Sequence, residues 1–183
     1  NLFNITAVSS KNNNLVYSEK NITNYFSGII SINENNTSQA LNFLKSVEPP
    51  QQQHPNFNIK FLRTLVLLGK IEESFSYAKN LSSENSNFTE ANLLLGIQNY
   101  INKDYNNAAK FAEKAIELSI YEFGYNHLTT AALNENRAKI FTATNNHLEA
   151  EKLFTRVVSI RKKNLKPHDP EYAESLDHLA KSI

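Results

Sequence analysis

Residues that could carry chemistry are few and widely separated in this chain. The five histidines form neither a His-x-x-x-His pair nor a His-Glu-x-x-His pattern, the spacings that bring zinc ligands to one helix face. The chain has four glycines, none of them clustered, and no cysteine, so neither a phosphate-cradling loop nor thiolate chemistry is predicted. The carboxylate pairs Glu72-Glu73 and Glu149/Glu151 have spacings that fit a solvated helix face. We therefore predict no metal site, no cofactor and no catalysis within this chain.

One pair of basic residues could bind a carboxylate. Lys60 and Arg63 stand three residues apart, so on a helix their side chains lie about one turn from each other. Two cations in this arrangement can grip a carboxylate through charge-assisted hydrogen bonds. The alternative interpretation is a solvated helix face.

Small residues recur at a fixed spacing and indicate which elements position these side chains. Frames that begin at residues 21, 55, 89, 131 and 173 are 34 residues apart up to residue 89 and 42 residues apart beyond it. Each of the five frames carries a small residue at position eight, position twenty or both: Gly28, Ala40, Ser74, Gly96, Ala108, Ala138, Ala150 and Ala180. A period in this range predicts stacked helical hairpins, and we interpret the small residues as points where two helices cross closely.

The same residues carry a resemblance to the tetratricopeptide repeat (TPR) family, whose unit is a 34-residue helix–turn–helix. The frame from residue 89 matches best, with Leu95-Gly96, Tyr105 and Ala115 at the family's positions. The last two frames resemble the longer repeats of kinesin light chains, with 124–127 and 166–170 in place of the extra turn. The resemblance implies an all-α, right-handed superhelical solenoid of antiparallel hairpins, with about four and a half repeats over residues 21–183. Residues 1–20 would be an N-terminal cap or the remnant of a preceding helix.

Charge and hydropathy exclude some classes of partner. The net charge is +1, from 19 basic and 18 acidic residues, which predicts binding neither to nucleic acid nor to an anionic membrane. No apolar run approaches the roughly 18 residues that span a bilayer, so membrane insertion is not predicted. The chain does not begin with Met and its last frame is incomplete, so we interpret it as a segment of a longer protein. Its localisation stays undetermined: the cytoplasm is slightly favoured and the periplasm is compatible.

The resemblance also implies a binding surface, because helix A of each repeat lines a concave groove in this family. In the long variant an Asn at position six holds the backbone of an extended ligand. Asn136 stands there in the fourth frame, and His178 replaces it in the fifth. The apolar side chains of this surface could instead pack against neighbouring helices, or they could form a groove for an amphipathic helix. The groove residues carried over are Tyr25, Phe26, Ile29, Lys60, Arg63, Leu93, Ile97, Tyr100, Asn136, Lys139 and His178.

The function that the resemblance implies is a protein–protein interaction scaffold that binds a partner peptide or amphipathic helix in this groove. Two alternatives stay open at this point. The chain could be a regulatory or substrate-presenting array fused to an enzyme domain, or a structural spacer that self-associates through exposed terminal repeats.

Overall fold

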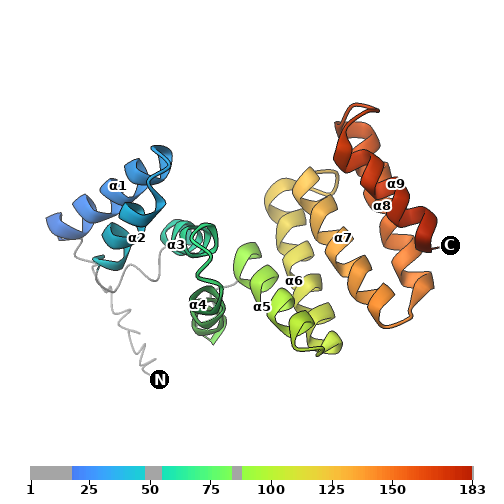
Figure 1. The fold of residues 1–183 in the computed structure, drawn as a ribbon, viewed down its shortest axis with the longest axis horizontal. Coiled ribbons are helices and arrows are strands. Elements are labelled where there is room, and N and C mark those ends of the chain that lie inside the picture. The colour runs from blue at the N-terminus through green and yellow to red at the C-terminus, as the bar shows by residue number, and fades with distance from the viewer. Residues whose placement is uncertain (1–17, 48–54, 84–87, 183) are drawn as a thin grey trace, which may run out of the picture. The chain divides into compact units, whose positions relative to one another are not determined.

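The structure, a computed structural model, describes residues 18–47, 55–83 and 88–182. Over these ranges the chain consists of α-helices and the turns between them (Figure 1). The predicted all-α, TPR-like fold class is confirmed. The predicted cap at residues 1–20 lies mostly outside the described residues. The helices are α1 (Glu19–Asn33), α2 (Thr37–Lys45), α3 (Pro55–Leu67), α4 (Ile71–Ser83), α5 (Thr89–Ile101), α6 (Tyr105–Phe123), α7 (Leu128–Ala143), α8 (His147–Asn164) and α9 (Pro170–Ser182).

The chain divides into two compact units, Asn1–Gln52 and Gln53–Ile183. In the first unit, α1 and α2 form one hairpin, in which Ser18 caps α1 by accepting a hydrogen bond from the Asn21 N–H at 3.2 Å. Gly28 lies at the crossing of these two helices. A Cβ there would come within 2.8 Å of the Leu44 side chain, so a larger residue at this crossing would have to displace Leu44.

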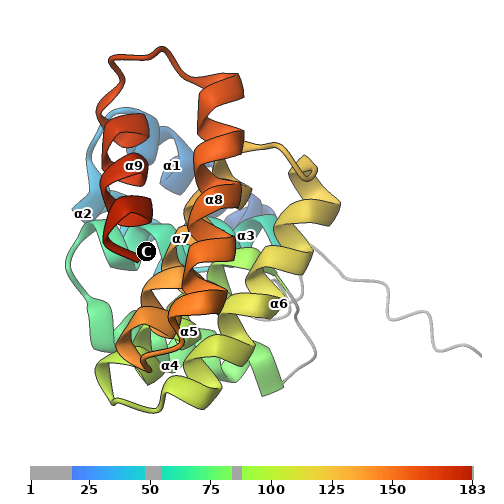
Figure 2. The same cartoon turned by 90° about the vertical axis from the view of Figure 1, so that its right-hand side faces the viewer.

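In the second unit, each helix from α3 to α9 packs against the next one along the chain. Figure 2 shows α9 beside α8 at the C-terminal end of this stack. The small residues lie at helix crossings, as expected: Ala138 of α7 packs with Ala150 and Phe154 of α8 in one buried cluster. Ala108 is fully buried and its carbonyl faces Gly96. Ala180 differs from the expectation, because on α9 it is exposed.

Four of the turns inside these hairpins share one backbone conformation. Each contains a residue in the left-handed region, with φ of 59° at Asn35, 68° at Gly69, 61° at Lys103 and 56° at Asn145. In each turn the next N–H donates to the carbonyl five residues earlier, at 2.8 to 2.9 Å. This is the Schellman arrangement, which satisfies carbonyls that the end of a helix leaves open. The four residues keep the 34- and 42-residue spacing of the sequence.

Side chains cap the helices that follow the later turns. Asp169 accepts a hydrogen bond from the Glu171 N–H at 3.1 Å, and Pro170 is the first residue of α9, where a missing N–H costs nothing. His127 caps α7 through the Thr129 N–H at 3.1 Å and stacks on Phe123. These two turns fix where α7 and α9 begin, and therefore which of their side chains face the rest of the second unit. The division into repeats starting near residues 21, 55, 89, 131 and 173 stays a prediction.

Candidate functional site

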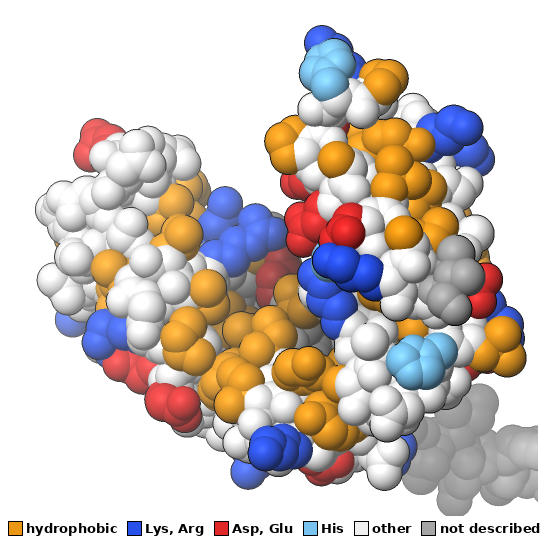
Figure 3. All heavy atoms as spheres, turned by 45° about the vertical axis from the view of Figure 1, so that its right-hand side comes forward, with side chains coloured by type: hydrophobic (Ala, Val, Ile, Leu, Met, Phe, Trp, Pro, Cys, Tyr) orange, Lys and Arg blue, Asp and Glu red, His pale blue; other side chains and the backbone are white. Residues whose placement is uncertain are grey.

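An apolar pocket of about 150 Å³ lies between α5, α6 and α7 in the second unit. Gly96 lies on its wall, where a Cβ would meet the backbone of Ala108 and Ala112 on α6 at 3.6 Å. The lining residues are Leu93, Gly96, Ile97, Tyr100, Ala112, Asn136, Lys139 and Ile140. Figure 3 shows apolar side chains gathered beside basic and acidic ones on the face it presents.

A second pocket, of about 350 Å³, adjoins the first and extends to α9. The two pockets share Tyr100 and Lys139, so we treat them as one groove and call them its apolar end and its ionic end. The ring of Tyr100 rests edge-on against Tyr105 at 5.5 Å, which fixes its position at the junction. The lining of the ionic end is Tyr100, Lys139, Thr142, Ala143, Phe154, His178, Lys181 and Ser182.

The apolar end exposes two apolar side chains and one amide without a hydrogen-bond partner among the described residues. The side chains of Ile97 and Tyr100 are each 40% exposed, although one is aliphatic and the other aromatic. Asn136 is exposed beside them, and its amide makes no hydrogen bond to any residue that the structure describes. An amide offers two donors and a carbonyl acceptor, so this side chain can pair with a ligand's peptide group.

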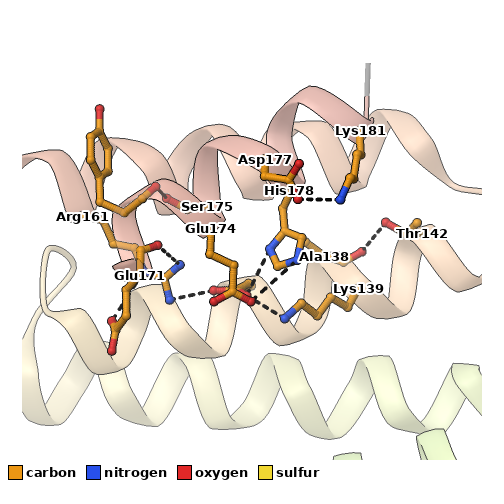
Figure 4. Close-up of polar contacts among 12 residues, drawn as sticks. Ala138, Lys139, Thr142, Arg161, Glu171, Glu174, Ser175, Asp177, His178 and Lys181 are labelled. Carbon is orange, nitrogen blue, oxygen red and sulfur yellow. Dashed lines mark hydrogen bonds and ion pairs between the residues drawn. The ribbon is translucent and has the colours of Figure 1, made fainter. Parts of the chain in front are cut away.

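At the ionic end, Lys139, Arg161 and His178 surround the buried carboxylate of Glu135. Figure 4 shows these three basic side chains. Its Oε1 lies 2.7 Å from Lys139 Nζ, and its Oε2 lies 2.7 Å from Arg161 Nη2. His178 Nδ1 lies 3.3 Å from Oε1, and the His178 ring stacks on Phe154. Because these residues come from α7, α8 and α9, one carboxylate connects three helices.

The pKa of Glu135 is lowered despite its burial. Burial by itself raises a carboxyl pKa, but the hydrogen bond from Lys139 and the charge of Arg161 lower it by more. Glu135 is therefore ionised at neutral pH, and it holds the side chains of Lys139 and Arg161 in fixed positions. Arg161 also donates to the Glu171 carbonyl at 3.1 Å, which attaches the first turn of α9 to α8.

Glu135, Glu174 and His178 place one potential metal-ligating atom each within 4.8 Å of one another. The two ring nitrogens of His178 face different carboxylates, with Nδ1 toward Glu135 and Nε2 toward Glu174 at 3.9 Å. A single ion could therefore use only one of the two nitrogens. Since Glu135 is also bonded to two cations, the geometry describes an ion-pair cluster better than a ligand set.

The structure brings together six of the residues that the sequence suggested for the groove. Leu93, Ile97, Tyr100, Asn136, Lys139 and His178 all line the two adjoining pockets. Lys60 and Arg63 line neither pocket, and Arg63 is engaged with Glu90 of α5 at 2.6 Å. Tyr25, Phe26 and Ile29 belong to the first unit, where Phe26 is 58% exposed and contacts the Tyr25 ring.

Sequence reasoning missed the central roles of Glu135 and Arg161. A signal for Arg161 was available, because it follows Ala150, Phe154 and Val157 at helical spacing and so falls on the buried stripe of α8. An arginine on such a stripe requires an acidic partner. Nothing local in the sequence indicated that this partner is Glu135, on the preceding helix.

The described helices include none with both the length and the apolarity that a membrane crossing requires.

Comparisons with known proteins agree with the fold. The sequence model of the tetratricopeptide repeat matches residues 89–163, which contain α5 to α8 apart from the last residue of α8. No curated protein sequence matches the chain. Several solved structures share its fold at low sequence identity.

One is a candidate kinesin light chain from Podosopora anserina with nearly identical TPR-like repeats; it is 14% identical, the match covers 91% of this chain and 87% of that one, and the TM-score is 0.60. Another is MamA from Desulfovibrio magneticus RS-1, which is 11% identical over 90% of this chain and 94% of that one, with a TM-score of 0.62. A third is a Rap protein complexed with competence and sporulation factor, 13% identical over 89% of this chain and 48% of that one, with a TM-score of 0.57. Residues 89–163 therefore match the tetratricopeptide repeat, and the chain shares the fold of solved TPR-like structures such as the kinesin light chain repeats.

Proposed function

We propose that this chain is a protein–protein interaction scaffold whose groove binds an extended segment of a partner protein. The observation that carries the proposal is the apolar end. Exposed Ile97 and Tyr100 lie beside an Asn136 amide that no described residue engages. A peptide would bury the two apolar side chains and supply the hydrogen-bond partners that the amide lacks.

Two further features support an extended segment as the ligand. The groove continues from the apolar end to the ionic end through Tyr100 and Lys139, so several consecutive residues of a ligand could lie along it. Its walls are helices fixed by buried clusters and ion pairs, so little ordering of the scaffold would accompany binding. The Rap structure, a protein of similar fold, contains a bound factor.

A carboxylate clamp at Lys60 and Arg63 is a weaker candidate for the ligand site. Arg63 is engaged with Glu90, so an incoming carboxylate would have to replace an existing partner. We assign no catalysis to this chain, because the ionisable groups of the groove serve one another in the Glu135 cluster. The division into an N-terminal segment and five repeat units remains part of this proposal.

Selection of displayed random peptides on the purified protein tests the function. Peptides that bind should lose binding about tenfold or more with Ile97→Asp, which places a charge in the apolar end. They should lose less with Asn136→Ala. Leu148→Asp is the matched control, because Leu148 is 64% exposed on α8 and lines neither pocket.

Folding of each variant is checked by its melting temperature. Binding that survives Ile97→Asp in a folded protein would contradict the groove as the site. Binding that requires a free peptide C-terminus and disappears with Lys60→Glu and Arg63→Glu would support the clamp instead. A selection that enriches no peptide would favour a structural spacer or a partner recognised as a folded surface.

A further inference from the structure

We infer that the groove selects segments in which an apolar side chain lies beside an acidic side chain, with Lys139 receiving the carboxylate. This inference rests on the proposed function and specifies the ligand of the same site. Its starting point is the charge of the lining. Among the described residues, the basic side chains that line the two pockets are Lys139, His178 and Lys181, and no carboxylate lines either pocket.

Lys139 is the surplus cation of the Glu135 cluster. Glu135 and Arg161 form a pair at 2.7 Å in which both side chains are more than nine-tenths buried, so each neutralises the other permanently. The side chain of Lys139 is 43% exposed and bonds to the remaining oxygen of Glu135. Lys139 can therefore turn toward a ligand without leaving a buried charge unpaired, whereas Arg161 cannot.

His178 is positioned to take the place that Lys139 would leave. Its Nδ1 is buried, lies 3.3 Å from the same Glu135 oxygen and makes no hydrogen bond to any described residue. When Lys139 moves to a ligand carboxylate, a small approach of His178 would give that oxygen a hydrogen bond from Nδ1. The cluster thus permits an exchange of partners at little cost to the fold.

The other lysine of the ionic end is less suited to this role. Lys181 is paired with Asp177 one turn away on α9, and both side chains are more than half exposed. Such a surface pair has a strength of only about 0 to 1 kcal/mol and is screened by salt. Lys139 also lines both pockets, so a carboxylate bound there lies next to the apolar end.

The geometry favours an acidic side chain over a chain terminus. Beyond Lys139 the groove continues into the larger pocket against α9, so a peptide crossing Lys139 has room to go on. Since Ile97, Ile140 and Lys139 line one pocket, the apolar and acidic side chains must be close in the ligand. On an extended segment they would stand at alternate positions, which point to one face about 7 Å apart.

Competitive peptide selection tests the inference. Random displayed peptides are selected on the wild-type protein, and enriched peptides are then synthesised with each Asp or Glu replaced by Asn or Gln. We expect enrichment of an apolar residue and an acidic residue at alternate positions. Neutralising that acid should weaken binding about tenfold, as expected for a charge-assisted hydrogen bond.

Variants of the protein identify the receiving residue. Lys139→Gln should cause the same loss as neutralising the peptide, and Lys139→Arg should restore most of the binding. Lys110→Gln is the matched control, because Lys110 is exposed on α6 and lines neither pocket. The two effects should not add: Lys139→Gln should bind acidic and neutralised peptides equally.

Enriched peptides that depend on Ile97 but bind Lys139→Gln as tightly as wild type would overturn this inference and leave the proposed function standing. Acidic peptides that lose binding with Lys60→Gln, and not with Lys139→Gln, would also overturn it. A selection that enriches no peptide on a folded protein would remove the proposed function itself.

Discussion

The two ends of the groove differ in what their side chains have left to offer a partner. At the apolar end, Ile97, Tyr100 and Asn136 are exposed, and the amide has no described partner. At the ionic end, Glu135 and Arg161 are buried and already satisfy each other. The difference separates binding from stability: substitutions at the apolar end should change affinity, and substitutions in the buried pair should change the fold. Lys139 lines both ends, so its substitution should change both the affinity and the stability.

The largest expected effect is on stability at the ionic end. Glu135→Ala should lower the free energy of unfolding by about 3 to 5 kcal/mol, because Arg161 is left buried without a counter-charge. Chemical denaturation measures the change. Glu149→Ala is the matched control, since Glu149 forms an exposed pair with Lys152 and should cost at most about 1 kcal/mol. Equal effects from the two variants would remove the distinction between the two ends.

Overpacking beneath the ionic end should have the next largest effect. Ala150 is fully buried and packs with Ala138 and with Phe154, on which His178 stacks. Ala150→Leu should therefore destabilise the protein by about 1 to 3 kcal/mol. A lowered melting temperature would report this change. An unchanged melting temperature would contradict the close crossing of α7 and α8.

Acid titration sharpens the comparison further. Because the folded-state pKa of Glu135 is lowered, its stabilisation is fully present above the unfolded pKa of about 4.3 and is lost as pH falls through the folded value. The stability difference between wild type and Glu135→Gln should be constant from about pH 7 to 5 and shrink below about pH 4. A stability difference that grows as the pH falls would show that the pKa of Glu135 is raised, not lowered, in the folded protein.

The smallest expected effect separates two glycines at equivalent crossings. An added Cβ at Gly96 would meet its nearest atoms at 3.6 Å, an ordinary contact, whereas at Gly28 it would meet Leu44 at 2.8 Å. Gly96→Ala should be neutral or stabilise by up to about 1 kcal/mol through helix propensity. Gly28→Ala should be less favourable by about 1 kcal/mol or more. Thermal melts of the two variants in the same buffer measure the difference. A lower melting temperature for Gly96→Ala than for Gly28→Ala would contradict the tighter crossing at Gly28.

Much of the fold could be predicted from the sequence, because the small residues at helix crossings and the hairpin turns recur at fixed spacing. The residues of the apolar end were among those that the resemblance to the repeat family implied. The buried pair did not, since Glu135 and Arg161 lie on different helices and meet only through the packing of α7 on α8. Pairing of this kind depends on tertiary geometry that no local pattern encodes.

Three asparagines carry a further sign of the repeat. Asn58, Asn92 and Asn134 are buried and keep the 34- and 42-residue spacing of the hairpins. Asn92 and Asn134 donate to the carbonyls of Phe88 and Thr130, and Asn58 accepts from the Tyr77 hydroxyl at 2.7 Å. Their regular burial could have been predicted by examining which asparagines share a repeat position.

The measurement that tests the account most directly is an amide NMR titration of the protein with a peptide enriched by selection. We expect the largest chemical-shift changes at Leu93, Ile97, Asn136 and Lys139, along α5 and α7. Small changes there, with large changes at the exposed Tyr121 and Tyr125 near the α6–α7 turn, would place the binding site elsewhere and contradict the groove as the functional site.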